Sequence, residues 1–427
     1  LMMIQMAYRL RIAASHLKAS PLLHPQTLED RNARLLYLNT ASIGVPAAGI
    51  GAFMAVFLAR LGASSTIIGW LTSAPALIGM LALIPGAIIA ERNSDQVRVR
   101  CNAIRTQRLT YLACALLPFV LPPTYLLIPL VALWAIKTIP ESISTPAWTA
   151  VIAKALSPQR RAQVNATRWA LLSIVSALAS AFFGWLLDLV VFPLNYQLVF
   201  FISFLFGWLD PFFFSKIRVE PLEKPVIGPD HGLWQRIADY FRPVLTYRPF
   251  LWAILLMLPY RFALNLPAPL FSLYWVNELR APDTLIGLRG TVGHAALVLG
   301  YTFWGSVTPR LGQRRVLTLS ALGLALYPIS TGLSPSPIWL LPAAAIWGLT
   351  ASGIDVAFFE VMLAAMPGQR QPLFAAVWSI VAQVAMFFGP LVGAGLAERI
   401  GVGPALVASG VAQALATLFF FRLPRAE

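Results

Sequence analysis

The chain has 427 residues, of which 58% are apolar and only 11% are charged, and its mean hydropathy is +0.72. This much apolar surface does not fit around one core that faces water, which excludes an ordinary soluble globular protein. The net charge of +15 is spread from loop to loop and forms no single basic stripe with interleaved aromatic residues, which argues against a nucleic-acid partner. We therefore interpret the chain as an integral membrane protein.

Segments of about 20 mostly apolar residues, long enough to cross a hydrocarbon layer of roughly 30 Å, follow one another along the chain. In the first half they lie near 34–60, 65–90, 104–122, 124–153, 164–190 and 194–214. In the second half they lie near 248–277, 283–309, 315–334, 337–366, 371–397 and 401–422. The sequence thus predicts an all-α protein with twelve transmembrane helices, six in each half.

Three more polar segments lie outside these spans. Residues 1–33 form an N-terminal arm that is too polar after Ala14 for a cleaved export signal, and residues 423–427 form a short tail. Residues 215–247 divide the two halves. Within this central loop, apolar residues at helical spacing predict an amphipathic helix on the membrane surface: Leu233, Trp234, Ile237 and Phe241.

The basic residues predict the orientation in the membrane. If the N-terminus is cytoplasmic, 26 of the 32 lysines and arginines fall on the arm, the tail or the inner loops. The six exceptions lie within spans or near the outer side: Lys137, Arg261, Arg60, Arg280, Arg289 and Arg399. This bias matches the positive-inside rule. We therefore expect both termini to be cytoplasmic, in a multi-pass protein of a bacterial-type inner membrane.

The two halves of the sequence are similar to each other. Leu61–Gly69, with the sequence LGASSTIIG, and Leu279–Gly287, with the sequence LRAPDTLIG, are separated by about half the chain. Further matches occur at similar offsets, among them Gly86 with Gly305 and Trp134 with Trp347. A repeat of this length is far longer than the unit of a solenoid, so it predicts two fused, related halves.

The turn after the eighth span carries a motif, Gly305-Ser-Val-Thr-Pro-Arg310-Leu-Gly312-Gln-Arg314-Arg315. It resembles the signature turn of the major facilitator superfamily, in which Gly, three residues, Asp, Arg, one residue and Gly precede basic residues; here Pro309 stands at the acidic position. In such a turn the first glycine permits close packing, the second reverses the chain, and the arginines meet phosphates, carbonyls or an acid.

The corresponding turn of the first half keeps a glycine, an acid and a base in Gly86, Glu91 and Arg92, although it shifts the acid by one place and lacks the second glycine. With the twelve spans and the internal repeat, the resemblance covers nearly the whole chain. It implies two six-helix bundles related by an axis along the membrane normal, a solute site between them, and alternating access by rocking of the halves. It also implies that the first, fourth, seventh and tenth helices line the cavity.

Ionisable residues deep within spans are candidate functional residues, because a charge at the bilayer centre costs about 2.5 to 3.5 kcal/mol on insertion scales. Five such residues all fall on the helices that the resemblance assigns to the cavity: Lys137, Glu141, Arg261, Asp355 and Glu360. Each of them needs a partner, water or a function. They are therefore the main candidates for a solute site.

Arg261 lies about midway along the seventh span, among prolines that we expect to break the helix: Pro259, Pro267 and Pro269. We favour Arg261 as a cation that faces the substrate or a gate. The alternative is a structural ion pair across the two halves. Tyr260 and Asn265 lie beside it as further cavity candidates, and Asn39 is the polar candidate from the first span.

Lys137 and Glu141 are one helical turn apart, so they either neutralise each other or belong to the functional site. Asp355 and Glu360 are separated by about 140° around a helix and cannot both face a cavity squarely. Asp355 and Glu141 are the preferred candidates for proton coupling, which needs a carboxyl whose proton affinity changes as the cavity opens. Glu360 lies nearer the cytoplasmic end, where it suits either an ion pair with an inner-loop arginine or coupling.

No cofactor, metal or catalytic nucleophile is expected, because Cys101 and Cys114 lack ligand spacing and His294 suits a packed or hydrogen-bonded role. The sequence favours a secondary transporter, not an enzyme. We expect a monomer that moves a small solute by proton coupling, with a polar, anionic or zwitterionic solute slightly favoured. The alternatives are a drug or metabolite efflux pump and a non-transport member of the same fold, such as a pigment-handling factor, an assembly factor or a sensor.

Overall fold

The computed structural model describes residues 25–220, 244, 246–367 and 371–422, and within them the chain is helical with no strand. The helices of the first half are α2 (Leu28–Pro46), η1 (Ala47–Gly51), α3 (Ala52–Arg60), α4 (Ser65–Glu91), α5 (Gln96–Val120), α6 (Pro123–Ile136), α7 (Thr138–Ala155), α8 (Pro158–Leu189) and α9 (Leu194–Phe214). The amphipathic helix predicted in the central loop lies outside the described residues.

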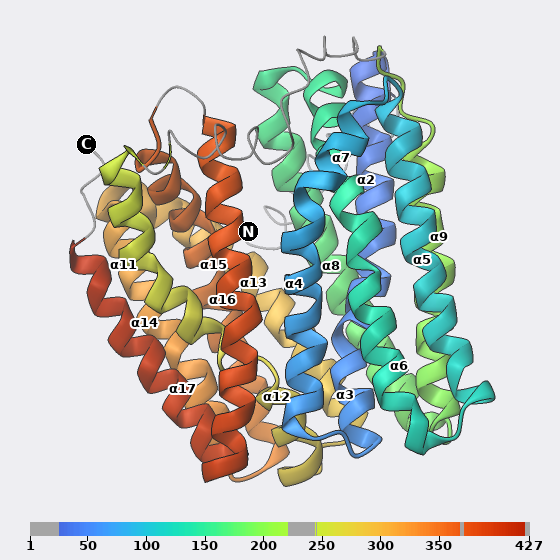
Figure 1. Cartoon of the computed structure of the whole chain (residues 1–427), viewed down its shortest axis with the longest axis vertical. Coiled ribbons are helices and arrows are strands. Elements are labelled where there is room, and N and C mark those ends of the chain that lie inside the picture. The colour runs from blue at the N-terminus through green and yellow to red at the C-terminus, as the bar shows by residue number, and fades with distance from the viewer. Residues whose placement is uncertain (1–24, 221–243, 245, 368–370, 423–427) are drawn as a thin grey trace, which may run out of the picture.

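The helices of the second half are α11 (Arg248–Asn265), α12 (Leu270–Leu273), η2 (Tyr274–Glu278), α13 (Asp283–Leu311), α14 (Gln313–Gly332), η3 (Pro337–Trp339), α15 (Leu340–Ala364), α16 (Gln371–Ile400), α17 (Val402–Thr417) and η4 (Leu418–Arg422). The two halves form two helical bundles, blue to green and yellow to red in Figure 1. Each predicted span corresponds to a helix or to a run of consecutive helices.

The largest disagreement with the predicted bounds is at helix starts, where α2, α5 and α8 begin several residues early. Capping groups explain the first two. The Oγ1 atom of Thr27 accepts from the backbone N–H of Asp30 at 3.1 Å, and Asp30 returns the bond to the N–H of Thr27. Asp95 likewise accepts from the N–H of Arg98 at 2.9 Å. Such caps extend a helix into polar sequence, which a hydropathy window does not register.

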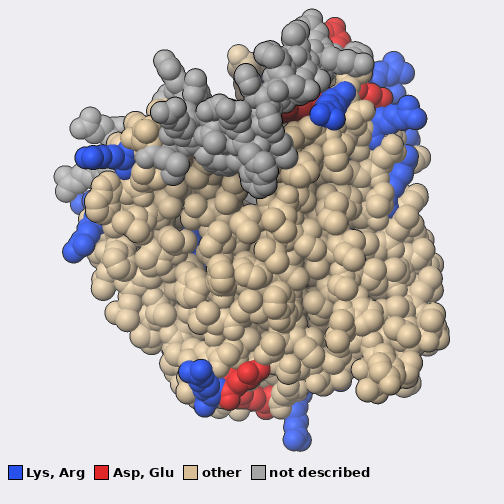
Figure 2. All heavy atoms as spheres, viewed as in Figure 1, with Lys and Arg blue, Asp and Glu red and all other residues tan. Residues whose placement is uncertain are grey.

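Nine helical stretches within the described residues are long and apolar enough to cross a membrane. Three further long helices, α5, α13 and α14, pack within the same bundles. Figure 2 shows charged side chains near the two ends of the molecule and a broad uncharged band between them. Large apolar side chains such as Val120, Ile128 and Leu178 are exposed, as expected for contact with lipid. The chain is therefore a multi-pass membrane protein.

An apolar core joins the two bundles at one end of the molecule. It includes Phe57 and Tyr196 from the first half and Trp275, Ile286 and Leu406 from the second. Two other apolar clusters each belong to a single bundle. The bundles accordingly meet near α3 and α12 and diverge toward the opposite end (Figure 1). We call the end where α3 finishes and α13 begins the closed end.

The bundles touch chiefly where α8 packs on α13 and where α4 packs on α16. Glycines allow the first of these contacts: a Cβ atom added to Gly184 would lie 2.7 Å from the carbonyl oxygen of Asp283, and one added to Gly287 would overlap the carbonyl oxygen of Ser180. At the second contact, a Cβ added to Gly69 would lie 3.2 Å from the Cβ of Ala394. Backbone-to-backbone approach of this kind requires small residues.

A buried ionic network fills the interior of the first bundle. Asp210 on α9 is fully buried, and its carboxylate accepts from Arg100 at 2.9 Å and from Arg108 at 3.1 Å, both on α5. Asn39 on α2 donates to the same carboxylate and to the carbonyl oxygen of Asp210. The sequence interpretation counted both arginines among the inner-loop basic residues, whereas the structure places them inside the bundle, where they tie three helices together.

Replacing Asp210 with Ala is expected to lower the free energy of unfolding by about 3 to 5 kcal/mol, because it leaves two arginines buried without a counter-charge. The thermal unfolding of the purified protein in detergent measures this. Glu220, an exposed carboxylate, supplies the control, and Glu220→Ala is expected to change stability by less than about 0.5 kcal/mol. Equal stability of the two variants would contradict the assignment.

Candidate functional site

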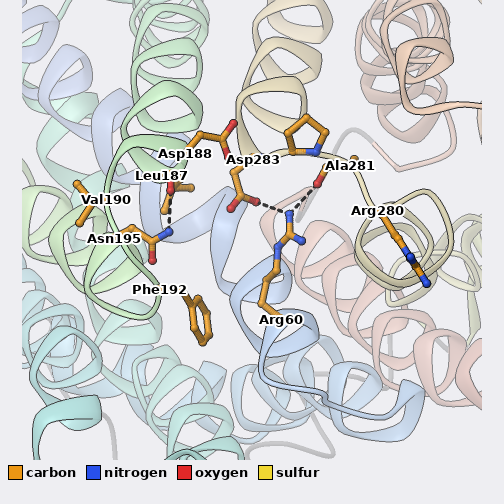
Figure 3. A pocket seen from close by; sticks show the side chains of 10 residues that line it. Arg60, Leu187, Asp188, Val190, Phe192, Asn195, Arg280, Ala281 and Asp283 are labelled. Carbon is orange, nitrogen blue, oxygen red and sulfur yellow. Dashed lines mark hydrogen bonds and ion pairs between the residues drawn. The ribbon is translucent and has the colours of Figure 1, made fainter.

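A cavity of about 530 Å³ lies at the closed end, where residues of both bundles line it (Figure 3). Its lining comes from α3, from the α8–α9 connection and from the start of α13: Arg60, Leu187, Asp188, Val190, Phe192, Asn195, Arg280, Ala281, Pro282 and Asp283. Both bundles contribute charged groups to this wall. The cavity therefore lies over the contact surface between the two bundles, which we call the seam.

An ion pair crosses that seam beside the cavity. Arg60 Nη2 lies 3.1 Å from Asp283 Oδ1 and donates to the carbonyl oxygen of Ala281 at 2.6 Å (Figure 3). The hydroxyl of Tyr196 donates to the same carboxylate oxygen at 2.9 Å. Asp283 is only 5% exposed, so the pair is poorly screened by water. Sequence reasoning assigned Arg60 to the outer side and did not single out Asp283; the repeated segment that contains Asp283 was the available signal.

Arg261 on α11 lies over the Phe358 ring, with 4.1 Å between its guanidinium carbon and the ring centroid. It forms no ion pair with any carboxylate in the described part of the chain. Phe358 is three residues from Asp355 on α15, which places the two side chains on neighbouring faces of that helix. Asp355 is exposed and accepts from the hydroxyl of Tyr301 on α13 at 2.8 Å. The structure thus brings Arg261 and Asp355 to one region without pairing them.

The neighbours of Arg261 behave differently from the prediction. α11 continues through Pro259 and ends at Asn265, so the helix breaks only around Pro267. Asn265 donates to the carbonyl oxygen of Arg261 at 2.7 Å and thereby binds the last turn of α11. Tyr260 is buried inside the second bundle, where its hydroxyl accepts from Gln413 at 3.3 Å. Tyr260 therefore supports the bundle and does not face a cavity.

Lys137 and Glu141 are paired at 3.5 Å, at the junction of α6 and α7. The ammonium of Lys137 also lies over the Trp134 ring at 4.4 Å, and Glu141 accepts from Gln107 at 3.0 Å. The side chain of Glu141 is 48% exposed. Of the two alternatives that the sequence left open, the structure has the self-neutralising pair formed, with the carboxylate still accessible.

The remaining polar candidates occupy separate positions. Asn39 is fully buried in the Asp210 network, so it lies inside the bundle and away from a cavity. Glu360 is exposed on α15 and makes no ion pair within the described residues. The inner-loop arginine nearest to it in sequence, Arg370, lies outside the described residues. His294 packs edge-on against Trp347, with 6.3 Å between the ring centroids, as expected for a packed histidine.

The two signature turns differ in detail. Gly312 has a φ of 80°, the region that favours glycine, and the chain reverses there as expected. A Cβ added to Gly86 would lie 2.6 Å from the carbonyl oxygen of Ser142, which explains close packing in the first half. Gly305 faces open space, contrary to expectation, since no atom lies within 4 Å of a Cβ added there. The neighbouring Trp304 contacts α15 through its indole N–H, which donates to the carbonyl oxygen of Leu349 at 2.7 Å.

The basic residues of these turns lie at the end opposite the closed end. Arg314 donates to the carbonyl oxygen of Phe420 at 2.9 Å and so holds η4 against α14. Four other charged residues of the turns are exposed: Glu91, Arg92, Arg310 and Arg315. Within the described residues, the turns therefore act through backbone conformation and through Arg314.

Two further arginines inside the helices escaped sequence reasoning. Arg168 on α8 lies 4.8 Å over the Trp148 ring and donates to Thr40 at 2.7 Å. Arg289 on α13 lies 4.1 Å over the Trp275 ring and donates to the Tyr327 hydroxyl at 2.6 Å. Within the described part of the chain neither arginine forms an ion pair, and aromatic faces and hydroxyls stabilise both cations. A search for acid–base spacing does not find such sites.

Comparison with known proteins identifies the family. The family model described as Major Facilitator Superfamily matches residues 36–265 and 254–427, once for each half. No curated protein matches the chain in sequence. The two matched ranges together cover most of the chain and agree with the two bundles.

Several solved structures share the fold. A D-xylose-proton symporter is 13% identical with a TM-score of 0.72, over 94% of this chain and 99% of that chain. The nucleoside transporter NupG is 11% identical with a TM-score of 0.67, over 93% and 100%. A bacterial homologue of the human lysosomal transporter Spinster, in an inward-facing and unoccupied conformation, is 17% identical with a TM-score of 0.66, over 93% and 97%. By the match across both of its halves, this chain belongs to the Major Facilitator Superfamily.

Proposed function

We propose that this chain is a secondary transporter that moves a small solute across the inner membrane by alternating access. The observation that carries the proposal is that, within the described residues, a shared apolar core and an ion pair join the bundles at the closed end, whereas the other two apolar clusters each lie within a single bundle. Two bodies joined at one end can rock about that contact, which exposes a site between them to one side and then to the other.

The distribution of charge supports an orientation with the closed end outside. Within the described residues, the closed end carries few basic residues, among them Arg60 and Arg280, and most of the others lie toward the opposite end. By the positive-inside rule, both termini are cytoplasmic, and the end at which the bundles diverge faces the cytoplasm in this conformation. This topology requires α5, α13 and α14 to cross as well, which makes twelve spans. Their polar residues face other helices in several cases, such as Arg108 and Arg289.

Arg261 supports a polar solute that carries a negative charge. A cation inside a membrane protein that lacks an acid within ion-pair distance attracts an anionic group strongly, because the surroundings screen it little. Lys137 is already offset by Glu141, so Arg261 is the stronger candidate for binding. Asp355, nearby and hydrogen-bonded to Tyr301, suits the positive group of a zwitterion or a coupling proton. Among carboxylates, Asp355 is our first candidate for proton coupling and Glu141 the second.

Replacing Arg261 with Ala is expected to abolish solute binding. A bound solute at 100 times its dissociation constant should stabilise the native protein by about 2.7 kcal/mol, and the variant should lose this gain. A thermal-shift screen of sugars, amino acids, organic anions and lipophilic cations measures it. Arg98→Ala, at an exposed arginine, is the control and should keep the gain. A solute that stabilises Arg261→Ala as well as the unsubstituted protein would contradict this site, and no solute in any class would favour a non-transport role.

Replacing Asp355 with Asn is expected to abolish solute accumulation driven by a proton gradient, because the amide cannot take up a proton. Exchange of labelled for unlabelled solute needs no net proton movement and should continue. Proteoliposomes with an imposed pH gradient separate the two activities. Glu141→Gln provides the comparison: if it alone removes accumulation, Glu141 carries the proton, and if neither variant does, neither Asp355 nor Glu141 is the coupling carboxylate. Failure of the unsubstituted protein to accumulate solute in a proton gradient would contradict proton coupling itself.

Replacing Gly287 with Val is expected to keep the closed end from closing, because its side chain would overlap the carbonyl oxygen of Ser180. Transport should fall at least tenfold while solute still binds from the outside. Gly395→Val on α16 is the matched control, since no atom lies within 4 Å of a Cβ added there. Uptake and binding are measured in parallel. Normal transport by Gly287→Val would show that the α8–α13 contact does not limit the cycle.

A further inference from the structure

The carboxylate of Asp188, in the last turn of α8, reaches across the seam to the first turn of α13. Its Oδ1 atom accepts from the backbone N–H of Asp283 at 3.0 Å, and its Oδ2 atom accepts from the backbone N–H of Thr284 at 2.8 Å. Figure 3 shows Asp188 directly beside Asp283 at the cavity wall. The first N–H groups of a helix have no partner within the helix, and a negative charge there is favourable. Asp188 therefore caps a helix that belongs to the other bundle.

A related contact occurs at the second seam. Glu398, near the end of α16, accepts from the hydroxyl of Ser65 at 3.1 Å and from that of Thr66, both in the first turn of α4. In each case the acid lies four residues after the position that packs on a glycine of the partner helix: Asp188 follows Gly184, and Glu398 follows Ala394. Residues four apart lie on one helix face, so the residue that packs closely and the acid contact the same partner helix.

The repeated segments of the sequence are the targets of these two acids. Ser65 and Thr66 in the first copy correspond to Asp283 and Thr284 in the second, and Gly69 corresponds to Gly287. Each copy thus contains the start of a helix and the glycine one turn later, and each is held by the acid-bearing end of a helix from the other half. Each copy of the internal repeat therefore lies at one of the two contacts between the bundles at the closed end.

The two copies differ in how the helix start is capped. Ser64 caps α4 within its own bundle, because its Oγ atom accepts from the backbone N–H of Ile67 at 3.3 Å. The second copy has Pro282 at this position, which has no side-chain acceptor, and α13 has no cap from its own N-cap residue. Asp188 supplies that cap from the other bundle. Separation of the bundles would therefore leave α13 uncapped but α4 still capped.

We propose that Asp188 acts as a trans cap, which means a helix cap supplied by the other bundle. This cap favours the conformation in which the two bundles meet at the closed end. Separation of the bundles at that end must break the cap, and the exposed N–H groups of α13 then form hydrogen bonds only with water. The contact of Glu398 with α4 favours this conformation less strongly. When it breaks, water readily solvates the hydroxyls of Ser65 and Thr66, and Ser64 still caps α4. This inference rests on the alternating access of the proposed function, and it assigns to Asp188 a role in the conformational equilibrium.

Pulsed electron–electron double resonance measures the distance between spin labels on the two bundles, and it tests the proposal without any solute. Val191 and Leu333 are exposed near the closed end, on opposite bundles, and are replaced with Cys for labelling. Both native cysteines, Cys101 and Cys114, are buried and are replaced with Ala in this background. Asp188→Ala is expected to raise the ratio of long to short distances about 5- to 30-fold, as loss of an N-cap implies.

Pro282→Ser supplies the decisive comparison, because it gives α13 the cap that α4 already has. In the Pro282→Ser background, Asp188→Ala is expected to change the distance ratio by less than about threefold. Glu398→Ala in the original background should have a smaller effect than Asp188→Ala. Unfolding temperatures of all variants confirm that the compared proteins are folded.

Equal effects of Asp188→Ala with Pro282 and with Ser at position 282 would overturn the trans cap, as would a folded Asp188→Ala protein with unchanged distances. Failure of the transport function gives a different result. In that case Asp188→Ala still lengthens the distances and Pro282→Ser still suppresses the effect, while no solute is bound or moved. The two claims are thus tested separately.

Discussion

The close approach of α8 and α13 is the contact on which the rest of the structure depends. Because Gly184 and Gly287 lack side chains, the two backbones come near enough for Asp188 to reach the start of α13. The same approach carries Asp283 to Arg60 and Tyr196, and it closes the apolar core across both bundles. A larger residue at either glycine separates the helices and removes all of these interactions together.

The charges inside the molecule follow a division of roles. Asp210 is neutralised within one bundle by Arg100 and Arg108, so this network does not depend on contact with the other bundle. Within the described residues, Asp283 forms its ion pair across the seam, with Arg60, so this pair requires the two bundles to meet at the closed end. Arg261 has an aromatic face and no counter-ion in the described residues. The charges paired within one bundle, the ion pair across the seam and the cation that we propose for solute binding are thus located in different places.

Much of the fold could be predicted from the sequence, because apolar length and glycine turns are local properties. The helix ends near Arg60, Asp283 and Gly312 agree with the predicted spans, and the spacing of Lys137 and Glu141 predicted the ion pair as one of two alternatives. The Asp210 network could not be predicted in this way. Its members lie on helices far apart in the sequence, and hydropathy does not say which faces of two helices meet.

The candidate site was predicted less well than the fold, for a related reason. Tyr260 was chosen because it lies beside Arg261, and Asn39 because it is a polar residue of the first span, but both side chains are buried in their own bundles. Gly305 was expected to pack closely because it occupies the first glycine position of the signature turn, yet no atom lies within 4 Å of a Cβ added there. The repeated segment was recognised as a sign of duplication, whereas its role in closing the seam depends on Asp188 and Glu398, which lie outside it.

The central claim is that the two bundles rock as rigid bodies about the α8–α13 and α4–α16 contacts. Distances measured at both ends of one protein test it most directly, with one label pair at Val191 and Leu333 and a second pair, in a separate sample, at Asn93 and Leu311 on the opposite end. Gly287→Val should lengthen the first distance and shorten the second. Distances that change at one end alone, or in the same direction at both ends, would contradict the account.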